Sequence, residues 1–327
     1  MKKSNNNPLF SIVVITYNQQ NYIEQTLKSA INQKVDFNFE IIISDDCSTD
    51  KTQEIIQNIL NNYKGNYIFN KNSKNLGVFL NYKKALNLCK GKYISTLPGD
   101  DYWQNPNRLQ LQKQFFDKNP DCGLVHSDCD ILYTAKNKLV KNHHKINRHN
   151  ILTGNNIFEK LLLNNLIIAQ TVCFKKLVFD KHIDLDYYNT NFMMEDYPMW
   201  LELSKHTKFG YIDESLATYR IIDNSLGHPT TIKKRFAFLE SYFKVKQYFI
   251  NKYGCSNNIQ KQINEEYHLK RLKLAFATYN KDIAFASFNS ITQKKFDYWF
   301  YYMGSKSKLI NKIVLFYFKL KNRINLI

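Results

Sequence analysis

The chain has 327 residues, of which 44% are hydrophobic and 15% aromatic, and its formal net charge is +18. This apolar content suffices for one large folded domain, or for a domain with an appendage, and it excludes an intrinsically disordered chain. No stretch of about 18 uncharged apolar residues occurs, and the Asn-rich start, Met1–Pro8, lacks the apolar core of a signal peptide. We therefore expect a cytoplasmic protein.

The positive charge is concentrated in the C-terminal third. Residues 229–327 contain 19 Lys and Arg against 5 Asp and Glu, whereas residues 1–228 contain 27 against 23. A basic, aromatic segment is typical of proteins that contact an anionic membrane surface, a nucleic acid or an acidic partner. The alternative is a compositional bias, because Asn, Lys, Ile, Tyr and Phe are abundant along the whole chain.

Short β-branched runs alternate with helical patterns over the first hundred residues. Leu9–Thr16 and Phe39–Ser44 have the pattern of strands buried on both faces of a parallel sheet, and Asn18 or Asn21 could cap the helix between them. The alternation continues with a helix at Thr52–Asn62, a strand at Asn66–Asn70, a helix at Val78–Cys89 and a strand at Lys92–Leu97. This order predicts an α/β fold whose ligands bind at the carboxyl ends of the strands.

The second half of the chain continues with less regular signals. The expected elements are a helix from Pro106 to about Lys118, a strand at Cys122–His126 followed by a hairpin, a helix at Ile157–Leu163, a strand at Gln170–Phe174 and a helix at Tyr197–Ser204. From Thr230 onward the pattern is helical and strand signals fade. Because charge and pattern change together, we place a domain boundary near residue 228, between an α/β domain at 1–228 and a basic helical region at 229–327.

Pairs of acidic residues occur at three places where a carboxylate would point into the ligand crevice. Asp45-Asp46 and Asp100-Asp101 each follow an apolar strand, and Glu195-Asp196 opens a helix. Two neighbouring carboxylates bind Mg²⁺ or Mn²⁺ well, because the cation takes oxygen ligands and relieves their mutual repulsion. The pattern therefore indicates a metal site at Asp100-Asp101.

Each acidic pair also has a structural interpretation. Asp45, Asp46 and Ser48 could cap the helix that follows them, and Asp100-Asp101 could form a turn before the next helix. One pair alone favours this interpretation. Three acidic pairs in one α/β crevice favour a ligand site.

The sequence resembles the family-two nucleotide-diphospho-sugar glycosyltransferases, which have the GT-A fold. The resemblance covers about residues 9–225 and rests on four segments in the family's order and spacing: SIVVITYNQQNYIEQTLKSAINQ, EIIISDDCSTDKT, NLGVFLNYKKALNLCKGKYISTLPGDDYWQNPNRL and MMEDYPMWLEL. It implies a GT-A domain, here with a helical C-terminal extension, that performs metal-dependent, inverting sugar transfer. The implied donor is a UDP-sugar, and the implied acceptor is a hydroxyl of a glycan or lipid-linked saccharide in bacterial surface polysaccharide or lipopolysaccharide synthesis.

The resemblance also implies how the donor is held. Thr16 and Tyr17 would border the nucleotide base, and Asp46 would accept a hydrogen bond from the base edge. Asp101 would be the direct ligand of Mn²⁺ or Mg²⁺, and Asp100 would touch the ribose or the metal.

Asp196, in the Glu-Asp pair, corresponds to the catalytic base of the family. It would take the proton from the acceptor hydroxyl, on the face of the sugar opposite the leaving diphosphate. The metal would offset the charge that builds on that diphosphate.

Two departures separate this chain from many relatives. Pro98-Gly99 precedes the acidic pair where relatives read D-x-D-D, so one acidic nucleotide contact is missing. Ile222 stands where relatives have the His of Y-R-x-H, and His228 could replace that histidine as a diphosphate or metal contact.

The C-terminal end has an amphipathic helical pattern. Its apolar positions are Leu309, Ile313, Phe316 and Leu320, and its flanking basic positions are Lys308, Lys312, Lys319 and Arg323. This pattern predicts peripheral attachment to an anionic inner leaflet, and the alternative is a helix packed on the catalytic domain. Two other functions stay open, a sugar-nucleotide-binding protein without turnover and a nucleic-acid-binding protein, although we expect no nucleic acid.

Overall fold

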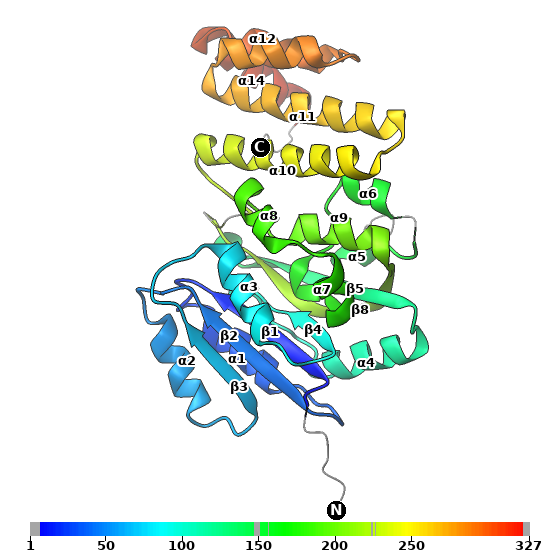
Figure 1. Ribbon diagram of the computed structural model, residues 1–327. Coiled ribbons are helices and arrows are strands. Elements are labelled where there is room, and N and C mark those ends of the chain that lie inside the picture. The colour runs from blue at the N-terminus through cyan, green and yellow to red at the C-terminus, as the bar shows by residue number, and fades with distance from the viewer. Residues whose placement is uncertain (1–6, 147–150, 156, 224, 226, 323–327) are drawn as a thin grey trace, which may run out of the picture. The chain divides into compact units, whose positions relative to one another are not determined.

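The computed structural model describes residues 7–146, 151–155, 157–223, 225 and 227–322 (Figure 1). The chain divides into two compact units, Met1–Ser225 and Leu226–Ile327. The first contains an eight-stranded sheet with helices, and the described part of the second contains helices alone. Of the predicted tail residues, Arg323 and the side chains of Lys319 and Leu320 lie outside the described part.

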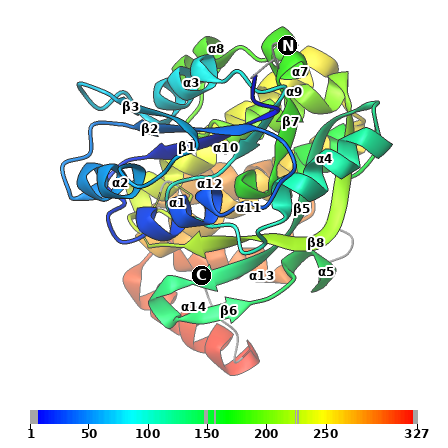
Figure 2. The ribbon, with the colours of Figure 1, turned by 90° about the horizontal axis from the view of Figure 1, so that it is seen from below.

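The first half of the sheet is parallel. It has the strand order β3-β2-β1-β4, made by β1 (Phe10–Thr16), β2 (Phe39–Asp45), β3 (Asn66–Lys71) and β4 (Tyr93–Thr96). The connecting helices are α1 (Ile23–Ile31), α2 (Thr52–Leu60) and α3 (Val78–Leu88). Figure 2 shows α1 and α2 on one face of these strands and α3 on the other. The predicted alternation of strands and helices is confirmed, and the pairing of Thr16 with Asp45 places the ends of β1 and β2 side by side.

Burial against the sheet explains the position of α1. Ile23, Leu27 and Ala30 recur at helical spacing, and all three are fully buried in the main core. The predicted helix cap is wrong, because neither Asn18 nor Asn21 caps α1, whose start has no side-chain cap. Burial of the apolar stripe therefore fixes this helix without a capping bond.

The second half of the sheet is mostly antiparallel around one long strand. Its strands are β5 (Cys122–Tyr133), β6 (Lys138–Val140), β7 (Cys173–Lys175) and β8 (Lys208–Ile221). The predicted hairpin is formed by β5 and β6, and β7 lies antiparallel between β4 and β5. Strand β8, which the sequence did not predict, runs parallel to β5.

Six helices accompany these strands. They are α4 (Arg108–Lys118), α5 (His143–Ile146), α6 (Phe158–Leu163), α7 (Lys176–His182), α8 (Leu185–Asn191) and α9 (Asp196–His206). Helix α9 is buried from Tyr197 to Ser204, and the Tyr197 hydroxyl donates to the Leu161 carbonyl at 2.7 Å. This burial fixes the start of α9, where the Glu195-Asp196 pair lies.

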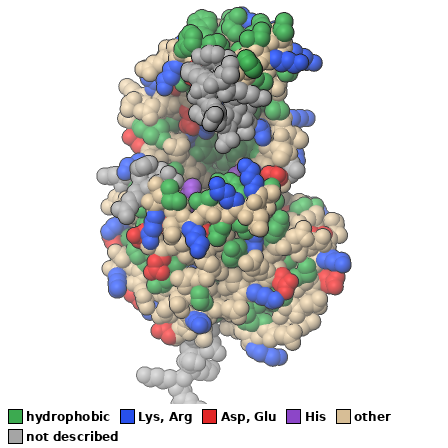
Figure 3. Space-filling model, turned by 180° about the vertical axis from the view of Figure 1, so that it is seen from behind, with side chains coloured by type: hydrophobic (Ala, Val, Ile, Leu, Met, Phe, Trp, Pro, Cys, Tyr) green, Lys and Arg blue, Asp and Glu red, His purple; other side chains and the backbone are tan. Residues whose placement is uncertain are grey.

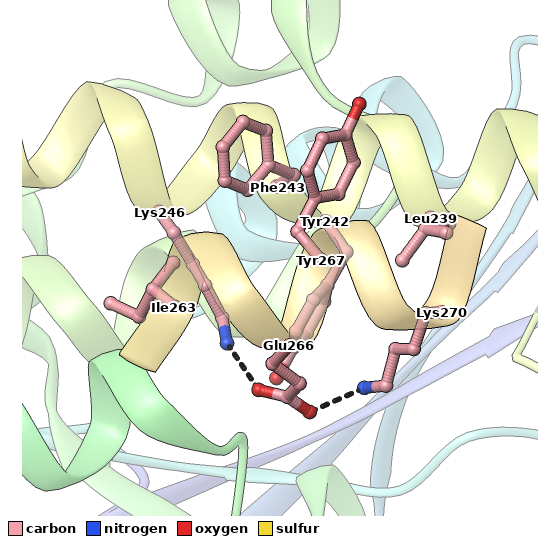
Figure 4. A pocket seen from close by; sticks show the side chains of 8 residues that line it. All are labelled: Leu239, Tyr242, Phe243, Lys246, Ile263, Glu266, Tyr267 and Lys270. Atoms are coloured by element: carbon pink, nitrogen blue, oxygen red, sulfur yellow. Dashed lines mark ion pairs between the residues drawn. The ribbon is translucent and has the colours of Figure 1, made fainter. Parts of the chain in front are cut away.

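The second unit is built from α10 (Ile232–Tyr253), α11 (Asn257–Thr278), α12 (Lys281–Ser290), α13 (Phe296–Gly304) and α14 (Lys308–Asn322). The helical prediction for this region is confirmed. Figure 4 shows a small pocket between α10 and α11, in which Glu266 pairs with Lys246 at 3.7 Å and with Lys270 at 2.7 Å. Its volume of about 10 Å³ admits at most one water molecule. Among the described helices, none combines the length and apolar character needed to cross a bilayer.

Candidate active site

Hydrogen bonds join the loop after β1 to the loop after β2. Asn18, with a left-handed backbone φ of 52°, donates its N–H to Ser48 Oγ at 2.8 Å and accepts from Thr49 N through Oδ1 at 2.8 Å. Gln19 N donates to Thr52 Oγ1 at 2.8 Å. Asparagine tolerates the left-handed conformation better than most residues. The two strand-end loops therefore form one connected surface at the carboxyl edge of the sheet.

Thr16 and Tyr17, predicted to border the nucleotide base, lie in different environments at the end of β1. Thr16 is 3% exposed, and its Oγ1 has no hydrogen-bond partner among the described residues. Tyr17 is 45% exposed. A Cβ on Gly99 would lie 2.9 Å from Thr16 Oγ1, so only glycine fits this approach. Thr16 Oγ1 is thus a buried polar atom that has no protein partner among the described residues, and the contact of Thr16 and Tyr17 with a base stays a prediction.

The carboxylate of Asp46 already has three protein donors. Oδ1 accepts from Asn72 Nδ2 and Leu76 N, both at 2.9 Å, and Oδ2 accepts from Gly77 N at 2.8 Å. These bonds hold the turn into α3, a role that the sequence did not reveal. Because a carboxylate offers about four acceptor positions, the contact of Asp46 with the base stays a prediction.

Asp45 supports the neighbouring loop. It accepts from Ser48 N at 2.9 Å and from Gln53 Nε2 at 2.6 Å. The first N–H of α2, on Thr52, is accepted by Asp50 at 2.9 Å. Helix α2 nevertheless starts without a side-chain cap, so the capping alternative for Asp45, Asp46 and Ser48 is wrong, and the Asp50 bond belongs to the turn before the helix.

Asp100 and Asp101 lie on a turn after β4. Asp101 N donates to Pro98 O at 3.1 Å, and Thr26 Oγ1 donates to Asp101 O at 2.6 Å. The Asp101 side chain is buried, and its Oδ1 accepts from Arg220 N at 2.7 Å. The turn predicted by the structural interpretation is therefore present, and it holds a buried carboxylate rather than a solvated one.

Arg220 on β8 is the residue of this site that sequence reasoning missed. It is buried, with its guanidinium 4.6 Å from the Tyr102 ring centroid and 5.2 Å from that of Tyr22. The guanidinium donates to the Asp100 carbonyl and to Gln25 Oε1. Arg220 thereby joins β8, α1 and the acidic turn. The Tyr-Arg dipeptide of Y-R-x-H was the only sequence signal that pointed to it.

Glu195 and Asp196 lie where α9 begins. Asp196 Oδ1 accepts from Tyr197 N at 2.7 Å. Burial raises the pKa of Asp196, and hydrogen bonds from Tyr197 N and the Asn165 side chain oppose this shift. Burial, followed by the charges of Asp196 and Asp100, raises the pKa of Glu195 to about 8. Burial and mutual repulsion therefore favour a proton within the Glu195-Asp196 pair.

The two acidic pairs share one electrostatic environment. Burial raises the pKa of Asp100, and burial together with the charge of Asp100 raises that of Asp101 well above its usual range. Asp100 also raises the pKa of Glu195. After burial, the charges of Asp101, Asp100 and Asp196 raise the pKa of Tyr219. The fold thus brings the pairs after β4 and before α9 together, although 94 residues separate Asp101 from Glu195 in the chain.

A family-wide sequence profile described as Glycosyl transferase family 2 matches residues 11–178, which include β2, β3, β4, all of β1 except Phe10, and the Asp100-Asp101 turn. The chain belongs to glycosyl transferase family 2. The predicted resemblance is confirmed, and the fold is that of GT-A glycosyltransferases with C-terminal helices.

Three known proteins illustrate the relationship of this family 2 member. An uncharacterised glycosyltransferase of Methanocaldococcus jannaschii is 30% identical over 77% of this chain and 83% of its own length. The putative teichuronic acid biosynthesis glycosyltransferase TuaG of Bacillus subtilis is 27% identical over 67% of this chain and 81% of its own. The mannosyltransferase PcManGT of Pyrobaculum calidifontis, solved with GDP-Man and Mn²⁺, has a TM-score of 0.59 at 13% identity and covers 94% of this chain and 86% of its own.

The acidic residues of this family 2 glycosyltransferase fit a divalent cation shared with a substrate. Among the described residues, no group of three or more His, Cys, Asp and Glu side chains could hold a metal alone. Mg²⁺-type cations often take one or two carboxylates and complete their shell with substrate phosphates and water. Burial, and after it the charge of Asp100, raises the pKa of Asp101, and a cation would offset both effects. The pair therefore suits a metal that arrives with a diphosphate.

Two sequence candidates remain, Trp103, for which the sequence favours ordinary packing of a large aromatic ring, and His228. Trp103 is packed, since its Nε1 donates to Gln170 O at 3.2 Å and the Arg108 guanidinium lies 4.3 Å from its ring centroid. The packing interpretation of Trp103 is thus confirmed. His228 belongs to the second unit, so its contact with a diphosphate or metal stays a prediction.

Proposed function

We propose that this glycosyltransferase moves a sugar, with inversion at the anomeric carbon, from a UDP-sugar to a hydroxyl of a glycan or lipid-linked saccharide. The observation that carries the proposal is the common electrostatic environment of Asp100-Asp101 and Glu195-Asp196. An inverting displacement needs a group that stabilises the departing diphosphate and a base that activates the acceptor. The two acidic pairs supply one candidate for each task.

On the donor side, Thr16 and Tyr17 would line the base and Asp46 would hold the loop beside it. Asp101, with Asp100, would hold Mn²⁺ or Mg²⁺, and the cation would offset the charge on the leaving diphosphate. Arg220 supports this arrangement, because its backbone N–H donates to Asp101 Oδ1 and holds that carboxylate in place. The donor half of the site is thus supported by four strands, β1, β2, β4 and β8.

On the acceptor side, Asp196 would remove the proton from the attacking hydroxyl. Tyr197 N and the Asn165 side chain orient its carboxylate, and burial raises its pKa, which strengthens it as a base. Burial and the charge of Asp196 raise the pKa of Glu195, which disfavours a second charge beside the base. A base and a leaving group on opposite faces of the sugar give inversion.

For the acceptor, we infer a surface polysaccharide or its lipid-linked precursor. TuaG, whose name assigns it to teichuronic acid biosynthesis, supports this class of acceptor. We also infer that the protein acts on the cytoplasmic side of a membrane as a peripheral protein. The excess of Lys and Arg in residues 229–327 supports contact with a negatively charged membrane surface.

Calorimetry and product analysis test this proposal. UDP should bind with Mn²⁺ and lose affinity when EDTA removes the metal, and GDP serves as the matched nucleotide control. A panel of UDP-sugars and saccharide acceptors should then give a product whose anomeric configuration, read by NMR, is opposite to that of the donor. A retained configuration contradicts inversion. Metal-dependent binding with no transfer to any acceptor, or to water, favours the alternative of a sugar-nucleotide-binding protein.

A further inference from the structure

Large apolar side chains are exposed together on α12, α13 and α14 and at the turn before α12. Eight of them, with exposures between 38% and 71%, lie within residues 279–316: Tyr279, Phe285, Phe296, Trp299, Met303, Leu309, Ile313 and Phe316. The other large apolar side chains with such exposure in the described residues are spread over residues 17–193. Figure 3 shows hydrophobic side chains gathered at the end of the second unit where Figure 1 places α12 and α14. We call these eight residues the apolar face, and patches of this kind mark interaction sites.

Helix α14 has two apolar sides. On its inner side, Val314 is 4% exposed and packs with Phe276, and Asn311 Nδ2 donates to Phe276 O at 2.9 Å. Its outer side consists of Leu309, Ile313 and Phe316, which are 71%, 60% and 64% exposed. Packing within the second unit therefore explains why the inner side of α14 is apolar, but it does not explain the apolar outer side. The outer side, which the sequence pattern singled out, has no packing role among the described residues.

The charges around the apolar face are mostly positive. Six exposed lysines lie within the same residues 279–316: Lys281, Lys294, Lys295, Lys306, Lys308 and Lys312. The acidic residues of this segment are Asp282 and Asp297. Apolar and aromatic side chains flanked by lysines match the interface of an anionic bilayer, where the rings enter the acyl boundary and the ammonium groups meet lipid phosphates.

We propose that the apolar face inserts into the interfacial layer of an anionic membrane. The proposal rests on the membrane location inferred above and not on the transfer reaction. A second copy of the chain would bring two like-charged faces together, which opposes dimer formation through this surface. A nucleic acid would use the lysines and rings but would leave the aliphatic Leu309 and Ile313 unexplained.

Trp299 provides a direct probe. The chain has three tryptophans, and Trp103 and Trp200 are 3% and 0% exposed whereas Trp299 is 48% exposed. With phosphatidylglycerol–phosphatidylcholine vesicles at low salt, the emission of the full chain should shift to shorter wavelength, and brominated lipids should quench it. Trp299→Phe should remove both responses while the variant still sediments with the vesicles. Sedimentation without any change in Trp299 emission would show that another surface makes the contact.

Substitutions on the full chain separate apolar from electrostatic contributions. Ile313→Ser with Phe316→Ser should weaken vesicle binding at least tenfold, and Leu139→Ser with Leu177→Ser, also exposed but on the first unit, should not. Neutralising Lys308 and Lys312 to Gln should weaken binding about fivefold for each lysine, whereas Lys136→Gln with Lys138→Gln should have little effect. Binding of UDP with Mn²⁺ should be unchanged in all of these variants, so the result does not depend on the proposed reaction.

Three outcomes would overturn the proposal. The first is equal vesicle binding by the apolar-face and control variants. The second is sedimentation-velocity evidence that the wild type is a dimer and that Ile313→Ser with Phe316→Ser makes it a monomer. The third is binding of single-stranded RNA that excludes vesicles and is lost in the Lys308 and Lys312 variants.

Discussion

Asp101 shows how one buried carboxylate can serve both the fold and the chemistry. It is 2% exposed, and burial of a charge without partners costs several kcal/mol, so it is tolerated only with strong compensation. The N–H of Arg220 provides part of this compensation through Oδ1. We expect a bound cation to provide the rest of the compensation. The neighbouring charge of Asp100 raises the pKa of Asp101 further, and a cation would offset that charge as well.

Replacement of Asp101 by Asn should therefore abolish metal-dependent donor binding without unfolding the protein. The amide oxygen still accepts from Arg220 N, but the negative charge is lost. We expect the affinity for UDP in the presence of Mn²⁺ to fall by about two orders of magnitude, or about 2.7 kcal/mol. Titration calorimetry measures the change, and Asp117→Asn, a surface carboxylate on α4, is the control. An unaltered affinity and Mn²⁺ requirement would remove Asp101 from the metal site.

Asp196→Asn should leave donor binding nearly unchanged and lower turnover by about two to four orders of magnitude, the usual contribution of a general base. In the wild type, kcat/KM should fall as the pH falls through the raised pKa of Asp196, because a protonated carboxyl cannot accept a proton. Glu195→Gln should keep an acid limb, because Asp196 remains as the base and its pKa is still raised by burial. Transfer by the Asn variant within a few fold of wild type would leave Asp196 as a helix-start residue only.

At the scale of elements, the predictable strands are those buried on both faces. β1 and β2 consist of β-branched apolar runs, which produce an unambiguous pattern. β8 does not, because its middle contains the exposed Asp213 and Glu214 and it pairs with β5, far away in the sequence. Two acidic pairs could be recognised because they directly follow readable strands, and the third because it opens a readable helix. Arg220 could not, since its role depends on where β8 lies, and the loop-holding bonds of Asp46 depend on a backbone turn.

Arg220→Lys tests this link between β8 and the acidic turn. Lysine keeps the charge and the backbone N–H bond to Asp101, but it lacks the forked guanidinium that reaches both the Asp100 carbonyl and Gln25. An unsatisfied buried carbonyl costs about 1–3 kcal/mol. We expect the Mn²⁺ concentration for half-maximal UDP binding to rise about tenfold, with Arg235→Lys on α10 as the control. A lower melting temperature with an unchanged Mn²⁺ requirement would limit Arg220 to a structural role.

At the scale of the whole molecule, two units with different compositions share one chain. The first has its own core around Ile12, Ile43 and Leu97, and the second has separate clusters around Leu272 and Phe276. The sequence predicts a boundary near residue 228, because the strand signals end where the charge rises. It could not predict which side of α14 is packed, because both sides are apolar and only the position of Phe276 distinguishes them.

Because the two units have separate cores, we expect the donor to stabilise the unit that binds it and not the other unit. UDP with Mn²⁺ at about one hundred times its dissociation constant adds about 2.7 kcal/mol to the stability of the unit that binds it, or about 5–10 °C for a unit of this size. Calorimetry should show two unfolding transitions, with only one of them shifted by the donor. In Trp299→Phe, fluorescence reports Trp103 and Trp200 of the first unit alone, and it should follow the shifted transition. Asp101→Asn should show no shift, and an equal shift of both transitions would mean that the two units unfold together.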